Sequence, residues 1–117
     1  MTSRELNLKL LEAIPEIKAQ YDEETSWQDG DETGSHIVFE DVLTPFVKLH
    51  LCEKNERICQ RLFDFLEELL ETEDGYAEEV VVLSVLESLI FDEDVEKRYL
   101  LSFAKSKTLH QFETLLS

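Results

Sequence analysis

The stretch from Leu62 to Glu96 contains thirteen acidic residues and not one Lys or Arg. Apolar residues recur within it three and four positions apart, which is the spacing that places side chains on one face of a helix. The run Val80–Leu83 would also suit a strand, but the flanking Ala77-Glu-Glu and Leu86-Glu-Ser-Leu favour a helix. The stretch is therefore predicted to form folded helices with a strongly negative surface rather than a disordered acidic tail.

Composition favours a globular chain made only of helices. One domain is expected for 117 residues, and a hydrophobic content of 43% is enough to form a core. Three Gly and two Pro leave little turn chemistry for a sheet of many strands. We therefore predict an all-α single domain over residues 1–117, with six or seven helices stacked as antiparallel helical hairpins.

Capping residues and a proline predict the helix boundaries near the N-terminus. Ser3 is expected to cap the first helix. Pro15 either kinks this helix or opens a second one at its first position, and the helical pattern continues to Ser26 or Trp27. Residues 28–35 are predicted to form a polar loop between helices.

The middle of the chain leaves one choice open. Helical spacing starts near residue 37, although a short strand at residues 37–39 is the alternative. Pro45 either kinks this helix or opens a new one that Thr44 caps. Asn55 is expected to cap the following helix, which covers residues 56–71.

The C-terminal part is predicted to contain three more helices. The first covers residues 76–91, Asp92 or Asp94 caps the second, and Ser106 or Thr108 starts the last.

Side chains within these helices are assigned to the core or to the surface by the same spacing. On helix 56–71, Glu67, Glu68 and Glu71 are predicted to point outward. On helix 76–91, Leu83 and Ile90 widen the apolar face, so this helix is expected to be covered on most sides.

Residues 29–40 match part of the spacing of a twelve-residue calcium-binding loop. They place Asp at the first and third positions, Gly at the sixth and Glu at the twelfth. Thr33 stands at the fifth position, His36 stands at the eighth where an aliphatic residue is usual, and the sequence has no second loop of this kind. A calcium-responsive module is one alternative, and a polar inter-helix loop is the simpler interpretation.

No catalytic motif is present, whether a Gly-rich phosphate loop, a Gly-x-Ser-x-Gly elbow or a His-Glu-x-x-His pair. His36 with Glu40, and His50 with Cys52, lack the ligand number and spacing of a zinc site. The clustered carboxylates are expected on solvated surface, whereas a general acid needs burial or a like-charged neighbour to raise its pKa. We therefore expect no enzyme, no cofactor, no metal site and no small-molecule substrate.

The net charge of −16 restricts the partners that the chain can bind. A sustained negative field repels nucleic acid and anionic membranes, and it attracts basic proteins. No apolar run approaches the ~18 residues that a membrane span needs. The N-terminal residues lack the apolar core of a secretory signal, and the two cysteines are expected to stay reduced. These features predict a cytoplasmic protein that binds neither nucleic acid nor membranes.

Aromatic residues adjoin several acidic clusters, a combination typical of binding hot spots. Generic solubility is the alternative explanation for the acidity. Bases gather apart, at residues 97–107, so the charge is polarised along the chain. The residues that we predict to contact a partner are Trp27, Glu71, Glu73, Asp74, Tyr76, Glu78, Glu79, Asp92, Glu93 and Asp94.

Four stretches together carry a resemblance: His36-Ile-Val-Phe-Glu-Asp-Val-Leu-Thr-Pro-Phe, Arg61-Leu-Phe-Asp-Phe-Leu-Glu-Glu-Leu, Val85-Leu-Glu-Ser-Leu and Ser106-Lys-Thr-Leu. In that order they resemble a family of small, acidic, helical bacterial proteins, mostly uncharacterised. Some of these look like immunity partners of polymorphic or contact-dependent toxins. The resemblance covers about residues 10–116, is carried by packing positions, and implies a helical fold and toxin neutralisation.

Charge and resemblance lead to one main hypothesis. The chain is expected to be an immunity protein that binds a cognate basic toxin domain of nuclease type through its acidic surface. An acidic helical adaptor or scaffold without a toxin partner is the alternative, followed by the calcium-responsive module.

Overall fold

Seven continuous helices account for most of the chain in the computed structural model, which describes all 117 residues and contains no strand. Their bounds are α1 (Ser3–Ala13), α2 (Lys18–Ser26), α3 (Ser35–Val38) continuing into α4 (Thr44–Cys52), α5 (Glu56–Glu71), α6 (Gly75–Val81) continuing into α7 (Glu87–Ile90), α8 (Lys97–Leu101) and α9 (Ser106–Leu116). Short 3-10 turns lie at η1 (Pro15–Ile17) and η2 (Gly30–Glu32). The predicted all-α fold of six or seven helices is confirmed.

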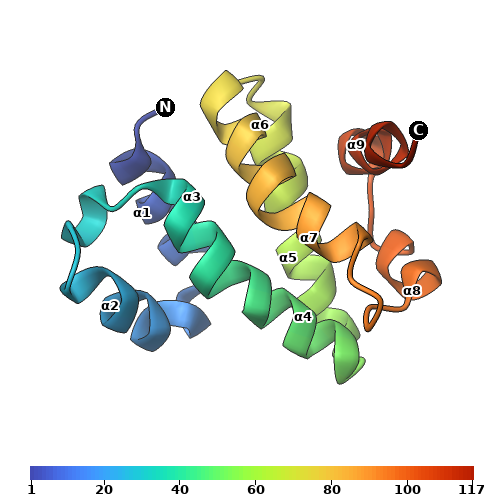
Figure 1. The fold of residues 1–117 in the computed structure, drawn as a ribbon, viewed down its shortest axis with the longest axis horizontal. Helices are drawn as coiled ribbons and strands as arrows, with labels where there is room; N and C mark the ends of the chain where they lie inside the picture. The colour runs from blue at the N-terminus through green and yellow to red at the C-terminus, as the bar shows by residue number, and fades with distance from the viewer.

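Helix α5 lies at the centre of the molecule (Figure 1). The α3–α4 helix and the α6–α7 helix pack beside it, while α1 and α2 cover one end of the molecule and α8 and α9 cover the other. Helix α5 and the α6–α7 helix form an antiparallel hairpin, as the sequence predicted. Helix α9 is seen almost end-on in the same view, so it crosses this hairpin instead of extending a regular stack.

One continuous core of 29 buried apolar residues holds the helices together. Helix α5 contributes from both of its sides, because Phe65 stacks on Phe39 of the α3–α4 helix and Phe63 stacks on Phe103 beyond α8. Burying apolar surface on both sides stabilises α5 by far more than its local helix propensity does.

Two π-turns, η3 (Phe39–Leu43) and η4 (Val82–Leu86), interrupt the two long helices where these pack together. The N–H of Thr44 donates to the carbonyl of Phe39 five residues earlier, and the hydroxyl of Thr44 donates to the carbonyl of Ser84 at 2.7 Å. The helix therefore continues through Pro45, and Thr44 joins two helices instead of capping a new one. The alternative strand at residues 37–39 is wrong, since these residues are helical.

Most helix starts lie where the sequence placed them, but several capping residues differ. Thr2, and not Ser3, caps α1, and it forms a capping box with Glu5. Pro15 opens η1 at its first position, which settles the choice left open there. Asn55 precedes α5 without a side-chain capping bond.

The predicted caps of α8 are wrong. Helix α8 starts after Glu96, and neither Asp92 nor Asp94 caps it. The carboxylate of Asp92 instead accepts the N–H of Asp94 within the preceding turn.

The predicted polar loop at residues 28–35 is held against α1 by a buried amide. The side-chain nitrogen of Asn7 donates to the carbonyls of Asp31 and Thr33, and the hydroxyl of Ser35 donates to the side-chain oxygen of Asn7. The Asp31 carboxylate accepts the hydroxyl of Tyr21 at 2.7 Å. The structure brings together no group of three or more His, Cys, Asp or Glu side chains that could hold a metal ion.

None of the helices combines the length and the apolarity that crossing a membrane requires.

Candidate functional site

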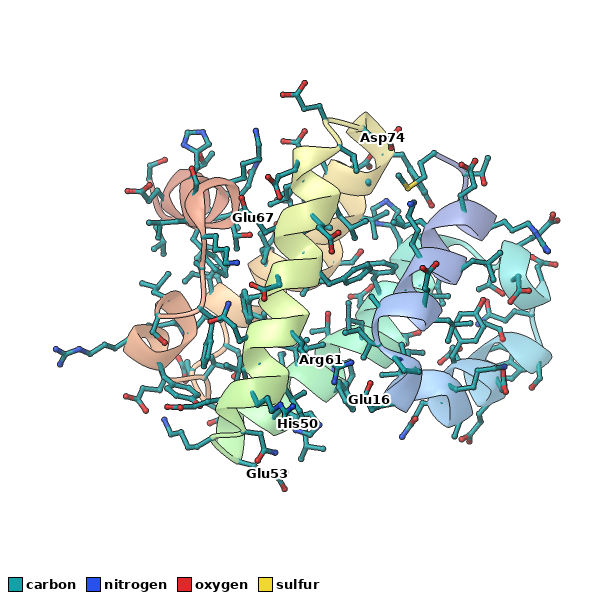
Figure 2. All side chains as sticks on the ribbon, turned by 180° about the vertical axis from the view of Figure 1, so that it is seen from behind. Glu16, His50, Glu53, Arg61, Glu67 and Asp74 are labelled. Atoms are coloured by element: carbon teal, nitrogen blue, oxygen red, sulfur yellow. The ribbon has the colours of Figure 1, made fainter.

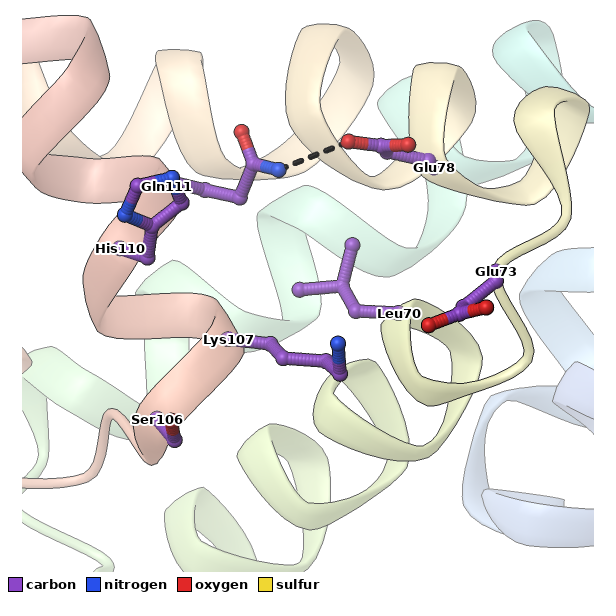
Figure 3. Close-up of a pocket in the computed structure, with 7 residues that line it drawn as sticks. All are labelled: Leu70, Glu73, Glu78, Ser106, Lys107, His110 and Gln111. Carbon is purple, nitrogen blue, oxygen red and sulfur yellow. Dashed lines mark hydrogen bonds between the residues drawn. The ribbon is translucent and has the colours of Figure 1, made fainter.

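A groove made of two adjoining hollows runs between α6 and α9. Its larger part, about 570 Å³, has walls from the end of α5, the start of α6 and the first turns of α9 (Figure 3). A second hollow of about 350 Å³ continues along α6 into η4. Glu78 and Gln111 line both hollows, and their side chains are joined by a hydrogen bond of 2.8 Å across the groove.

Glu67 of α5 helps to position α9, and with it one wall of the groove. Its carboxylate accepts the N–H groups of Lys107 and Thr108 at 3.0 and 2.9 Å, and the hydroxyl of Thr108 at 2.9 Å. Helix α9 has no side-chain cap of its own, so Glu67 satisfies its first free N–H groups from a neighbouring helix (Figure 2).

The ionisation of Glu67 follows from these contacts. Burial raises the pKa of its carboxyl, but the N–H groups of Thr108 and Lys107 and the Thr108 hydroxyl outweigh burial, and the pKa falls below its ordinary value. The side chain of Glu67 is only 7% exposed. The prediction that Glu67 points outward is therefore wrong, because its partners lie forty positions further along the chain.

Asp74 and Tyr76 were predicted to contact a partner, and both hold the fold together. Asp74 caps α6 by accepting the N–H of Ala77 at 2.9 Å, and it pairs with the amino group of Met1 at 2.8 Å. The Met1 ammonium and the Ala77 N–H lower the pKa of Asp74. The hydroxyl of Tyr76 lies 2.7 Å from that of Ser3 and so ties α6 to α1.

Four other predicted contact residues are exposed near the groove. Glu73 and Glu78 line its larger hollow, and Glu79 lines the smaller one. Glu71 is exposed on the last turn of α5. None of these four carboxylates forms an ion pair with Lys or Arg, and Glu79 lies 3.6 Å from the Nε2 atom of His36.

The remaining predicted contact residues lie elsewhere. Asp92, Glu93 and Asp94 follow the far end of α7, about 20 Å along the helix from Glu78 at 1.5 Å per residue. Asp92 pairs with Lys48 at 2.8 Å, and this lysine lowers the pKa of the Asp92 carboxyl. Trp27 is 72% exposed and follows α2, which lies at the opposite end of the molecule from α8 and α9. The ten residues therefore do not form one face.

Sequence reasoning missed several groove residues. Leu83 was assigned to the apolar face, yet it is 52% exposed and lies between Glu79 and Glu87, four residues from each. A spacing of four residues places all three side chains on one face of the helix, so the sequence itself indicated that Leu83 points outward with the two glutamates. Lys107 and Gln111 of the α9 wall carry no such signal, because only the tertiary fold brings α9 beside α6.

The two walls of the groove differ in charge. Glu73 and Glu78 contribute carboxylates from the α5–α6 side, and Lys107 and His110 line the α9 side (Figure 3). Leu70 is the only apolar residue that lines the larger hollow. Lys107 forms no ion pair, so its ammonium is available within the groove.

A family model described as a domain of unknown function (DUF7674) matches residues 7–116. The chain belongs to the DUF7674 family. No curated protein and no solved structure matches the chain. The matched range of the DUF7674 domain contains both walls of the groove, but the family description attaches no activity to them.

One cluster of side chains in the DUF7674 domain contains the residue types of a hydrolase triad. The Nδ1 atom of His36 lies 2.9 Å from the hydroxyl of Ser84, and its Nε2 atom faces Glu79. A nucleophile needs an adjoining space for the reacting group. Ser84 is 4% exposed, and neither His36 nor Ser84 lines any of the five main cavities. The hydrogen bond between His36 and Ser84 fastens α3 to η4.

Proposed function

We propose that this DUF7674 protein is an immunity protein. It binds a cognate basic toxin domain of nuclease type in the cytoplasm, and it blocks either the active site or the substrate-binding surface of that toxin. One observation carries the proposal: the outer face of the α6–α7 helix presents carboxylates at Glu78, Glu79 and Glu87 that no Lys or Arg neutralises.

The distribution of ion pairs supports this choice of surface. Six of the eleven basic side chains form ion pairs with carboxylates, and they are Arg4, Lys18, Lys48, Lys54, Arg61 and Lys105. Figure 2 shows one of these pairs, Arg61 with Glu16. The outer face of α6–α7 keeps its negative charge, and such a field raises the association rate of a cationic partner by ~10- to 1000-fold.

The charge of the whole chain agrees with binding a basic partner. A net charge of −16 on 117 residues opposes folding through self-repulsion. A cationic partner relieves that repulsion, so complex formation stabilises the folded chain. An acidic adaptor that binds other cellular proteins would use the same surface, and only the identity of the partner distinguishes it from an immunity protein.

Co-expression with a toxin-like protein encoded beside this chain tests the proposal. We expect growth rescue from that toxin and no rescue from an unrelated toxin of the same chemistry. The association rate of the purified pair is expected to fall at least about tenfold between ~0.05 and ~0.5 M salt. Failure of rescue by well-expressed protein would remove the immunity function and leave the adaptor.

A further inference from the structure

We propose that the α6–α9 groove receives a basic amphipathic segment of the partner, an inference that rests on the proposed function. An apolar side chain of this segment lies on Leu83, and its Lys or Arg side chains pair with Glu78 and Glu79. The segment is a helix or an extended strand short enough to lie between the two walls, and its recognition combines one apolar contact with two charged ones.

Size and lining charge separate the smaller hollow of this groove from the other hollows that carry carboxylates. Lysines line two of those beside the acidic groups, and the one that Asp41 lines is smaller, about 190 Å³. The smaller hollow is lined by Val82 and Leu83 together with Glu78, Glu79 and Gln111, so apolar and acidic groups face the same space. Leu83 is 52% exposed on the outer side of its helix, where the neighbouring exposed residues are carboxylates. An exposed apolar side chain beside carboxylates that no base neutralises is typical of a protein contact.

The region of Trp27 offers the same kinds of residue without the hollow. Helix α2 carries an adjacent acidic pair, Glu23 and Glu24, one turn before the exposed Trp27. None of these three residues lines any of the five main cavities. An entering side chain would therefore bury little surface there, and the groove is the better site for a lasting complex.

The two walls also give the bound segment a direction. Its bases face α6, where Glu78 exchanges its hydrogen bond from Gln111 for a stronger one from an ammonium or guanidinium group. Lys107 on the α9 wall repels a base placed opposite it. The preferred segment therefore has a neutral or acidic side chain near Lys107 and its bases on the other side.

Charge-reversal variants with a matched control test the site. The probe is a fluorescein-labelled synthetic helix of about 14 Leu and Lys residues with Leu at i, i+3, i+4 and i+7, titrated at low salt by anisotropy. Glu78→Lys/Glu79→Lys and the control Glu23→Lys/Glu24→Lys both change the net charge from −16 to −12. We expect the groove variant to weaken binding about tenfold and the α2 variant by less than about threefold.

Variants at Leu83 and Lys107 test the apolar contact and the charge of the α9 wall. Leu83→Ala is expected to weaken binding about fivefold, whereas Leu49→Ala, at a leucine of matching 51% exposure, leaves it unchanged. Lys107→Gln should tighten binding of this wholly basic probe about twofold. The emission of Trp27, the only tryptophan, should stay constant during the titration.

Three results would overturn the groove as the site: equal weakening by the two double variants, a change in Trp27 emission that follows occupancy, or no saturable binding of the probe. None of these results changes whether the unmodified chain rescues growth, so failure of the groove as the site can be told apart from failure of the immunity function. Circular dichroism and thermal melting of each variant confirm that the chain has folded. Since Leu83 and the four reversed glutamates lie on the surface or close to it, we expect melting temperatures near that of the unmodified chain.

Discussion

Glu67 and Glu78 stand eleven residues apart in the same base-free stretch, and they have different roles. Glu67 is buried and accepts three hydrogen bonds from the start of α9. Glu78 is exposed and accepts one bond from Gln111 across the groove. The number of acidic residues therefore overstates the surface that a partner can use, because the fold itself binds some of the carboxylates.

Asp74 and Asp92 resemble Glu67, because their carboxylates are also bound by groups of the same chain. Each accepts a backbone N–H and pairs with a cation of the same chain, the Met1 ammonium for Asp74 and Lys48 for Asp92. A carboxylate whose acceptor positions are filled gains less from a new cation than a free one does. The comparison separates carboxylates that support the fold from those that are free to bind.

The largest expected effect is on stability, and it comes from replacing Glu67. Glu67→Gln keeps the size of the side chain but removes the charge and turns an amide N–H toward the N–H groups of Lys107 and Thr108. We expect the free energy of unfolding to fall by about 2 kcal/mol, because buried donors lose a charged acceptor. Urea denaturation measures the change.

The neighbouring exposed residue is the matched control. Glu68→Gln makes the same chemical change one position later and should alter the free energy of unfolding by less than about 0.5 kcal/mol. Equal losses in the two variants would show that Glu67 does not support α9 in the way its contacts indicate.

The pH dependence of this difference sharpens the comparison. The pKa of Glu67 is lowered from its ordinary 4.5 in the folded chain, so the stability that it contributes is present above pH 4.5 and is lost as pH falls through the folded value. We expect the gap between the unmodified chain and Glu67→Gln to be constant from pH 7 to about 5.5 and to narrow below 4.5.

The difference in free energy of unfolding between the two proteins reports on Glu67 alone, because the other carboxylates titrate alike in both. Urea titrations of both proteins at a series of pH values measure this difference. A gap that widens as pH falls would mean that the neutral form of Glu67 is the one that supports the fold, contrary to its hydrogen bonds.

Local patterns predicted most of the fold. Helix spacing and capping residues predicted both bounds of α5, the end of α2 and one of the two starts offered for α9, because helix periodicity depends on residues close together in the sequence. The start of α2 was predicted less well, since Pro15 opens η1 and α2 begins only at Lys18. The two π-turns carried no such signal. They lie where the hydroxyl of Thr44 contacts the carbonyl of Ser84, a residue forty positions away in the sequence.

The site was predicted in part, for the same reason. Glu78 and Glu79 were selected from the sequence because they form an acidic cluster close to the aromatic Tyr76. The groove itself needs α9 beside α6, and Glu67 helps to hold α9 there through its bonds to Thr108. A surface made by one helix can be read from the sequence, whereas a groove between two helices requires the tertiary contacts.

The smallest expected effect concerns Glu73, which lies at the edge of the groove and adopts a φ of 57° directly after α5. This left-handed conformation costs a residue with a Cβ about 1 kcal/mol, and Gly avoids that cost. Glu73→Gly should therefore raise the free energy of unfolding by about 0.5 kcal/mol once the greater freedom of Gly in the unfolded chain is subtracted. Thermal unfolding measures the gain.

Two controls separate backbone strain from charge in that result. Glu73→Ala removes the carboxylate but keeps the strained φ, so a gain as large as that of Gly would show that charge repulsion was the cause. Lys54 has a similar φ of 60°, but its ammonium pairs with Glu96 and lies 3.9 Å from the centre of the Tyr99 ring. Lys54→Gly should relieve the same strain and lose these contacts, so its net gain is expected to be smaller than that of Glu73→Gly. Equal increases in the free energy of unfolding at both positions would mean that the side chain of Lys54 contributes nothing to the fold. The difference between charged residues that are paired within the fold and those that are free would then not apply at the ends of α4 and α5.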